Sequence, residues 1–254
     1  MKAFAMIDTA FDFRTDAGER DPDTHSATLR RYHRLLWSKA LPGGEAFNLD
    51  DTTPGVYLHH RSQLGEFSLA SDSVIPTFTR WMRMQSIVTQ LPEAENEAFR
   101  TISYTIGGML LFPGNRVDGK LTINGDRGLN PRIADRIDLT LECIRRHYRC
   151  EASPLGETLQ RYRDFFSLFG DFPGYVEFFL LQDLVTNDGG GVKFSMHFDD
   201  FTTPAVPKDI ETYKEYRRLT IEFVKARNGR IYQWVVEHQQ QTPEHKGPPG
   251  LPSR

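Results

Sequence analysis

Cysteine is scarce in this chain of 254 residues, which contains only Cys143 and Cys150. Two cysteines cannot form a disulfide framework or a four-cysteine zinc site, so those classes of protein are excluded. Long apolar runs are also missing, because no stretch approaches 18 consecutive apolar residues, and a membrane-spanning helix is not expected. The first residues carry Asp8 and Asp12 where a signal peptide needs an apolar core. These features predict a protein of the reducing cytoplasm.

Several motifs of well-known enzymes are absent as well. The chain has no Gx4GK[ST] phosphate loop, no GxGxxG after a predicted strand, and no HExxH, GxSxG or paired CxxC motif. The missing motifs argue against a nucleotide-hydrolysing motor, a Rossmann dehydrogenase, a zinc protease and an α/β-hydrolase. A structural role is expected for Cys143, which falls in a predicted helix.

Neither sign of charge is in large excess, since 31 basic and 34 acidic side chains leave a net charge of −3. A protein dedicated to duplex DNA usually has a strong basic excess, so that class is not favoured. The charge is uneven, however, because residues 100–149 contain nine Lys or Arg and five Asp or Glu. This local excess is compatible with one basic face on an acidic body, and equally with chance fluctuation.

The composition is otherwise that of a folded globular protein, with 39% hydrophobic residues, 18 Phe, 9 Tyr and 3 Trp. The length suits one large or two small domains, and the best candidate boundary lies at Glu151–Gly156. No long linker divides the chain, whereas the C-terminal QQQTPEHKGPPGLPSR is polar and rich in Pro and Gly. We therefore predict a single domain over residues 1–238 and a disordered tail over 239–254.

Strands are predicted mainly in the first half, where apolar residues alternate. They cover Lys2–Arg14, two segments within Phe47–Ile75 that a turn at Gln63–Gly65 joins, Ile102–Phe112 and Leu121–Ile123. Helical periodicity and capping residues predict three helices in the same half, at Asp23 or Ser26 to Pro42, Thr77–Leu91 and Asn130–Tyr148.

The second half is rich in phenylalanine, with nine of the 18 between Phe165 and Phe201. Its pattern predicts two helices broken at Gly170–Gly174, a strand VKFSMHF, and a last helix from Ile210 to about Arg227. The following IYQWVV either extends that helix or forms a strand. Strands clustered in the first half and helices in the second favour an α+β fold over an alternating α/β fold.

The segment from Gly114 to Arg132 is the strongest candidate for a binding site. Its glycines let backbone N–H groups approach a ligand, and a predicted helix N-terminus beside basic side chains favours oxyanions. The candidate anion-binding residues are Asn124, Arg127, Arg132, Arg116 and Lys120. Two tight hairpin turns with solvated charges are the alternative explanation of the same pattern.

His59 and His60 form a second candidate site, because adjacent residues of a strand point to opposite faces. One of them would face a cleft, and across the hairpin it would meet Glu66 or Asp72. A histidine oriented by a carboxylate is suited to proton transfer, so both histidines are candidate catalytic residues. The alternative is a polar hairpin at the edge of a sheet.

A weaker candidate is His197 with Asp199 and Asp200, since a histidine and two carboxylates can bind a divalent metal. No further residues with matching spacing support this interpretation, and the two aspartates also fit a turn at the end of a strand. No metal site is therefore predicted, and the cofactors stay open.

Three stretches of the chain have distinctive sequences: YHRLLWSKALPGGEAFNL, GGMLLFPGNRVDGKLTING with RGLNPRIADRIDLTLECIRRHY, and GYVEFFLLQDLV. In these stretches the chain resembles a family of bacterial proteins known only as a domain of unknown function. The resemblance extends over roughly residues 3–230. It implies a bacterial, cytoplasmic protein with one integrated domain, and it implies no activity and no catalytic residue.

Two functions of different classes follow. The first is an enzyme or sensor for a phosphate-bearing ligand, a nucleotide or an RNA end. Asn124, Arg127 and Arg132 would hold the phosphate, and His59 or His60 would act as acid or base. Arg127→Ala would then weaken ligand binding in a protein that stays folded. The second is a non-catalytic subunit of a bacterial complex, such as a defence or toxin–antitoxin assembly. It predicts a homo-oligomer or a protein partner that docks on an exposed apolar surface of the Phe-rich half.

Overall fold

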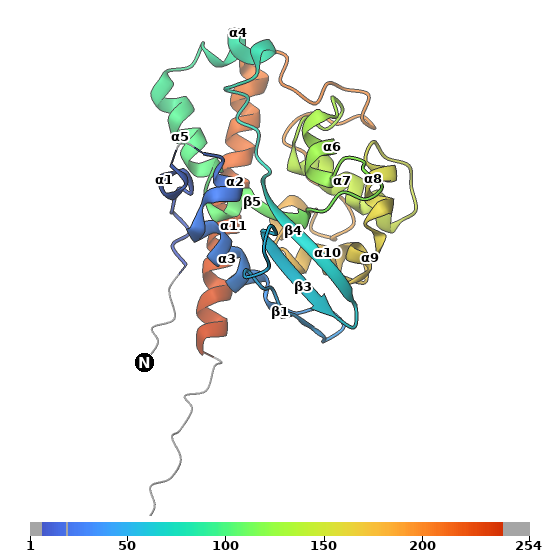
Figure 1. Ribbon diagram of the computed structural model, residues 1–254. Coiled ribbons are helices and arrows are strands. Elements are labelled where there is room, and N and C mark those ends of the chain that lie inside the picture. The colour runs from blue at the N-terminus through green and yellow to red at the C-terminus, as the bar shows by residue number, and fades with distance from the viewer. Residues whose placement is uncertain (1–6, 19, 241–254) are drawn as a thin grey trace, which may run out of the picture.

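The computed structural model describes residues 7–18 and 20–240 (Figure 1). The helices are α1 (Arg14–Ala17), α2 (Pro22–His25), α3 (Ala27–Trp37), η1 (Met82–Met84), α4 (Gln85–Val88), α5 (Glu93–Ser103), η2 (Ile106–Gly108), α6 (Ile123–Leu129), α7 (Ile137–Tyr148), α8 (Gly156–Arg161), α9 (Arg163–Ser167), α10 (Phe172–Phe178), η3 (Gln182–Leu184) and α11 (Ile210–Gln240). The strands are β1 (Lys39–Ala40), β2 (Ala46–Phe47), β3 (Leu58–Ser62), β4 (Gly65–Ser73) and β5 (Met109–Pro113). Within the described residues, all strands lie in the first half and the second half is helical, so the predicted α+β fold is confirmed.

A three-stranded antiparallel sheet of order β3-β4-β5 forms the centre of the first half. β3 and β4 form the hairpin that the sequence predicts, with Leu58 opposite Leu69. Gly65 closes the turn with a φ of 136°, a conformation that side-chain-bearing residues rarely adopt. The C-terminal end of β4 lies beside α2, where the backbone N–H of Ser73 donates to the Asp23 carboxylate at 3.0 Å.

Side-chain caps explain the two helices next to the sheet. Asp21 accepts a hydrogen bond from the Asp23 backbone at the start of α2, and Pro22 occupies the first helical turn. The Ser26 hydroxyl accepts from the Leu29 backbone at 3.0 Å, so Ser26 caps α3 as predicted. This helix ends at Trp37 rather than at Pro42, because the chain then pairs with β2 as strand β1.

The 31-residue helix α11 runs along the length of the molecule and contacts η2 and α5 (Figure 1). Two of its tyrosines hold the segment 75–81. The Tyr213 hydroxyl donates to the Thr77 carbonyl at 2.7 Å, and the Tyr216 hydroxyl donates to the Pro76 carbonyl at 2.9 Å. These contacts compete with helix formation, and the predicted helix Thr77–Leu91 is reduced to η1 and α4.

Most phenylalanines of the second half are core residues. Seven of the nine are buried, namely Phe165, Phe166, Phe169, Phe172, Phe178, Phe179 and Phe201, and Phe194 and Phe198 are half-buried. Five of these rings, in α9 and α10 and just after each helix, have centroids 5.0–5.5 Å apart in tilted and edge-on pairs; they are Phe165, Phe166, Phe169, Phe178 and Phe179. These seven phenylalanines therefore belong to the core, and the exposed apolar surface of the interaction-subunit hypothesis stays a prediction.

The predicted strand Ile102–Phe112 is wrong in its first part. Residues up to Ser103 belong to α5, and the strand β5 begins only at Met109. Gly108 explains the sharp change of direction, because a Cβ atom there would lie 2.0 Å from the Ser103 carbonyl oxygen. Sequence periodicity treats this apolar run as continuous, whereas the glycine lets it turn between two elements.

Two further predictions around α6 are wrong. Leu121–Ile123 forms no strand, because the Thr122 hydroxyl caps α6 and accepts from the Gly125 backbone at 3.2 Å. The predicted helix Asn130–Tyr148 begins only at Ile137. Ala134 and Asp135 precede it with φ values of 49° and 65°, which do not fit a right-handed helix.

The second half departs from the prediction in its details. Three short helices, α8, α9 and α10, replace the two expected ones, and VKFSMHF contributes only a bridge between Val185 and Val192. IYQWVV continues α11. Residues 7–13 form no strand, and the rest of the N-terminal strand prediction, residues 2–6, lies outside the described part. Residues 239 and 240 of the predicted tail are helical, and residues 241–254 also lie outside it.

Within residues 7–18 and 20–240, no helix combines the length and apolar character that a membrane crossing requires.

Candidate functional site

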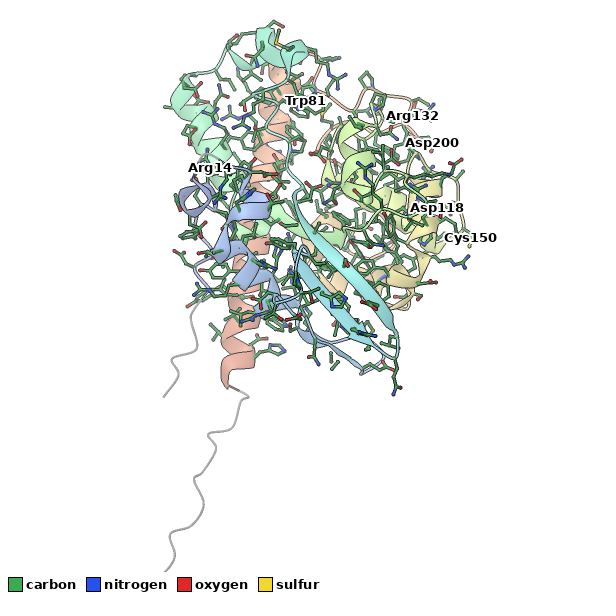
Figure 2. The ribbon with its side chains drawn as sticks, viewed as in Figure 1. Arg14, Trp81, Asp118, Arg132, Cys150 and Asp200 are labelled. Carbon is green, nitrogen blue, oxygen red and sulfur yellow. The ribbon has the colours of Figure 1, made fainter. Side chains whose placement is uncertain are left out.

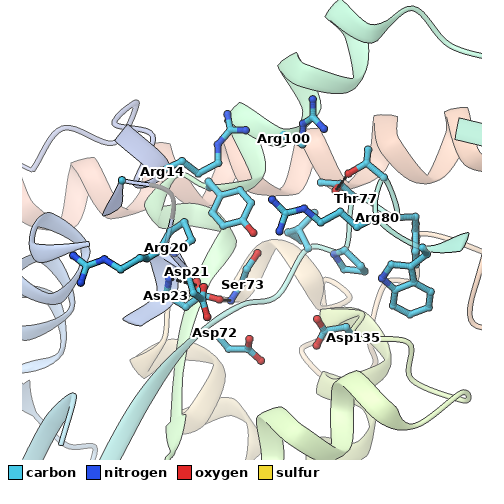
Figure 3. Close-up of a pocket in the computed structure, with 18 residues that line it drawn as sticks. Arg14, Arg20, Asp21, Asp23, Asp72, Ser73, Thr77, Arg80, Arg100 and Asp135 are labelled. Carbon is cyan, nitrogen blue, oxygen red and sulfur yellow. Dashed lines mark hydrogen bonds between the residues drawn. The ribbon is translucent and has the colours of Figure 1, made fainter. Parts of the chain in front are cut away.

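A cavity with eight charged residues in its lining lies between the N-terminal helices, the end of β4 and α5 (Figure 3). Its volume of about 580 Å³ is within the range of pockets that bind small molecules. The charged lining residues are Arg14, Arg20, Asp21, Asp23, Asp72, Arg80, Arg100 and Asp135. Phe78, Trp81 and Tyr104 add aromatic surface to the wall. The cavity is called the pocket from here on.

Asp23 provides the carboxyl group at the base of the pocket. The cap of α2 orients it, and its Oδ2 atom accepts from the Ser73 backbone at 3.0 Å. Its Oδ1 atom is buried and has no hydrogen-bond partner among the described residues. A buried carboxyl oxygen without a donor is costly, by about 1–3 kcal/mol. Such an atom in a pocket wall is available to a ligand.

Arg127 lies below Asp23 and binds two further carboxylates of the pocket. It is fully buried on α6, with Nη1 on the Asp72 carboxylate and Nη2 3.3 Å from an Asp135 carboxylate oxygen. Nη2 also donates to the Asp135 carbonyl at 2.8 Å, and Nε donates to the Thr140 hydroxyl at 2.8 Å. The Arg127 guanidinium therefore forms ion pairs with two carboxylates, and a third carboxyl group, that of Asp23, lies close by.

This crowding keeps protons on the carboxyl groups at unusually high pH. Burial, with the charges of Asp21 and Asp135, raises the pKa of Asp23 to about 7. Burial also raises the pKa of Asp72 well above its ordinary value and raises that of Asp135, although Arg127 opposes both shifts. A carboxyl group with a pKa near 7 can accept or donate a proton at neutral pH, which is the requirement for acid–base chemistry.

Arginines form the opposite wall. Arg14 binds Asp12 at 2.5 Å and Glu97 at 2.8 Å, and Arg100 binds Glu97 at 2.6 Å. Arg80 differs, because it is exposed and forms no ion pair or hydrogen bond within the described residues. In Figure 3 its guanidinium reaches into the space between Arg100 and Ser73. A ligand can thus bind Arg80 without breaking an ion pair or hydrogen bond to any other described residue.

Two residues of the lining have a left-handed backbone. Phe78 has a φ of 60° and Asp135 a φ of 65°. For a bulky aromatic residue this conformation is a clear outlier. Phe78 is held in it by burial and by ring contacts with Trp81 at 5.2 Å and Tyr216 at 5.3 Å. Strained residues of this kind concentrate at ligand-binding and catalytic sites.

The five anion-binding residues predicted from the sequence do not converge. Arg127 is buried, and each of its three nitrogen atoms already donates to a protein acceptor. The Asn124 amide donates to the Ser71 carbonyl at 3.2 Å. Arg116, Lys120 and Arg132 are exposed and do not line the pocket. Figure 2 shows Arg132 on the other side of the molecule from Arg14. Arg127 does not line the pocket itself but binds Asp72 and Asp135, which do. The arrangement does not favour the segment 114–132 as a separate phosphate site.

The two candidate histidines point to opposite faces of β3, as the strand geometry requires. His59 Nε2 lies 2.9 Å from the Glu66 carboxylate across the hairpin. Both ring nitrogens of His60 are occupied, one by the Asn48 carbonyl and the other by the Ser62 hydroxyl, each at 2.9 Å. Neither histidine lines the pocket. Their proposed role as acid or base stays a prediction that the position of the pocket does not support.

The metal interpretation of His197, Asp199 and Asp200 gains no support either. The segment forms no strand, and Asp200 binds Arg146 at 2.5 Å. Throughout residues 7–18 and 20–240, no group of three or more His, Cys, Asp or Glu residues is arranged to hold a metal ion. The aspartates of the pocket form no such group.

Sequence reasoning missed the pocket because its residues are far apart in the chain. The sequence indicates Asp23 only as a helix cap and Asp72 only as a partner of a histidine. Arg80 and Asp135 lie within predicted helices. The Asp21-Pro22-Asp23 sequence carries a local signal, since a cap followed by proline fixes the direction of the next carboxylate. No local pattern identifies the other residues.

A family model matches most of the chain. The model of DUF6994, a family of unknown function, matches residues 7–231. This range contains every residue of the pocket. No curated protein and no solved structure matches the chain.

Proposed function

The chain belongs to the family DUF6994, whose function is unknown, and we propose that it binds a phosphate-bearing small molecule in the pocket. A nucleotide, either free or at the end of an RNA, is the class of ligand that fits best. This is the ligand class that the sequence indicates, but we propose that it binds in the pocket and not at the segment 114–132. The observation that carries it is Arg80, a guanidinium in the pocket without a protein anion among the described residues.

The other arginines of the pocket support an anion at this position. Arg14 and Arg100 already share Glu97, yet both line the cavity beside Arg80. A phosphate accepts several hydrogen bonds at once, and guanidinium groups bind it through two parallel N–H donors. Trp81 and Phe78 supply apolar surface in the same cavity, which suits a ligand with a planar ring.

The carboxyl groups provide the means for chemistry on such a ligand. Asp23 carries a pKa of about 7 and a buried Oδ1 atom without a donor among the described residues. In the bound state it would take a proton from the ligand or give one to it. Asp72 and Asp135 are held by Arg127, and we assign them the role of positioning this group rather than of contacting the phosphate.

Binding assays on two arginine variants test the proposal. Wild-type protein, Arg80→Ala and Arg132→Ala are titrated calorimetrically with AMP and with a short 5′-phosphorylated RNA. Loss of a charge-assisted hydrogen bond costs about 1.5–3 kcal/mol, so Arg80→Ala is expected to weaken binding roughly 10–150-fold.

Arg132→Ala is the matched control, because Arg132 is also exposed but belongs to the segment first predicted from the sequence. It is expected to bind as wild type does. Weakened binding in Arg132→Ala with unchanged binding in Arg80→Ala would overturn the placement of the ligand. Absence of binding by wild type at millimolar AMP and RNA would overturn the function itself.

A further inference from the structure

The charges around Asp23 do not balance. Asp23, Asp72 and Asp135 are three carboxyl groups around the single guanidinium of Arg127, and Asp21 adds a fourth carboxylate nearby. Arg14 and Arg100 bind other carboxylates, namely Asp12, Glu93 and Glu97. Arg20 also lines the pocket, but in Figure 3 its guanidinium points away from Asp23. Among the described residues, these pocket carboxyl groups therefore form ion pairs with Arg127 alone.

One oxygen of Asp23 also lacks a hydrogen bond. Oδ1 is buried and has no partner among the described residues, whereas Oδ2 already accepts from the Ser73 backbone. The charge of Asp23 contributes to raising the pKa of both Tyr57 and Tyr104, but neither hydroxyl is hydrogen-bonded to Asp23. Burial raises the pKa of Tyr104 to about 12, so its hydroxyl stays neutral and supplies no charge. A ligand group that is both a donor and a cation would correct both deficits.

Most of the pocket's arginines and aspartates lie on different sides. In Figure 3 Arg14, Arg80 and Arg100 lie toward one side of the cavity, and Asp23, Asp72 and Asp135 lie toward the other, where Arg20 directs its guanidinium away from them. A ligand that spans the pocket would thus meet guanidinium groups at one end and carboxyl groups at the other. Complementary charge at both ends of one ligand discriminates against compounds that carry only the phosphate.

From the unpaired Asp23 oxygen and the uncompensated carboxyl cluster, we propose that the ligand carries a protonated amine in addition to its phosphate. The amine binds Asp23 while the phosphate binds Arg80. The substrate class is then an aminoalkyl or amino-sugar phosphate, or a nucleotide with an attached amine. This inference rests on the proposed function, because it assumes that Arg80 holds a phosphate.

A matched pair of small phosphate esters tests the inference. O-Phosphoethanolamine and 2-hydroxyethyl phosphate differ only in an ammonium group that replaces a hydroxyl group. Calorimetric titration of wild-type protein at pH 7 is expected to show at least tenfold tighter binding of the amine. In Asp23→Asn, this preference is expected to disappear while binding of the hydroxyl compound is retained. Asp23→Asn keeps the size of the side chain, and thermal unfolding checks that it is folded.

A second measurement needs no variant. Because Asp23 is partly protonated near pH 7, binding of the ammonium ion is expected to release a proton, whereas binding of the hydroxyl compound releases none. Titrations in two buffers with different ionisation enthalpies count the protons released.

The outcomes separate the two proposals. Equal affinity for the two esters without proton release would overturn the inference and leave the proposed function standing. The same holds if the preference for the amine persists in Asp23→Asn. If neither ester nor AMP binds at millimolar concentration, the proposed function fails and the inference fails with it. Weakening of both esters in Arg80→Ala would show that the phosphate end is placed correctly.

Discussion

Arg127 is the residue at which sequence and structure lead to opposite predictions. The sequence predicts that Arg127→Ala weakens ligand binding in a folded protein. In the structure the side chain is fully buried and binds Asp72, Asp135 and Thr140. Its removal leaves two half-buried carboxyl groups, those of Asp72 and Asp135, without their cation. We therefore expect a loss of stability rather than a selective loss of binding.

The size of this loss follows from the burial of the ion pairs. Breaking a buried pair by removing one partner typically costs about 3–5 kcal/mol, out of a total stability of about 5–15 kcal/mol for a typical domain. For a chain of this size, each 1 kcal/mol lowers the melting temperature by about 2–4 °C. Arg127→Met avoids an empty cavity, so its effect isolates the charge.

Urea unfolding of wild type, Arg127→Met and the triple variant with Asp72→Asn and Asp135→Asn measures the effect. The triple variant removes both orphaned carboxyl groups and is expected to recover part of the lost stability. The loss in Arg127→Met is expected to be smaller at pH 5 than at pH 8, because protonation neutralises the carboxyl groups at the lower pH. A stability within about 0.5 kcal/mol of wild type at pH 8, the usual range for an inconsequential surface substitution, would refute the reasoning.

Four other substitutions or titrations give independent checks. The raised pKa of Asp23, about 7, means that the folded state binds the proton of this carboxyl group more tightly than the unfolded state does. The stability that this proton provides is therefore lost as pH rises from about 4 to 7. Urea unfolding across this range should show a decline in the free energy of unfolding, and Asp23→Asn should reduce that decline. Burial lowers the pKa of Lys39 to about 7, so between pH 7 and about 10 the unfolded state binds more protons and stability should rise, a rise that is absent from Lys39→Met. Gly108→Ala would place a Cβ atom 2.0 Å from the Ser103 carbonyl and should cost about 1–3 kcal/mol or more in thermal unfolding. Gly128→Ala in helix α6 has open space around the new atom and should instead stabilise the protein by up to about 1 kcal/mol; similar effects of the two glycine substitutions would contradict the close approach at Gly108.

The parts of the fold that depend on local chemistry could be predicted. Ser26 caps α3, the turn before Gly65 closes the β3–β4 hairpin, and His59 meets Glu66 across it. Each involves residues close in sequence, for which capping and strand alternation are sufficient guides. The distribution of strands and helices between the two halves follows from the same local patterns.

The parts that depend on distant contacts could not be predicted. The segment 77–91 has helical periodicity, but Tyr213 and Tyr216, more than 130 residues away, bind the carbonyl groups of Thr77 and Pro76 at its start. From the sequence, Arg127 is expected to be exposed and to bind an anionic ligand. In the structure its guanidinium binds Asp72, which lies 55 residues earlier in the chain. The candidate site is built from such pairings, and for this reason its residues had no signature in any single stretch of the chain.

A crystal structure of the protein with AMP would show where the phosphate binds. We expect density for a phosphate group in the pocket, within hydrogen-bonding distance of the Arg80 guanidinium, with the rest of the ligand directed toward Asp23. A phosphate bound instead at Lys120 or Arg132, with the pocket free of ligand, would contradict this placement.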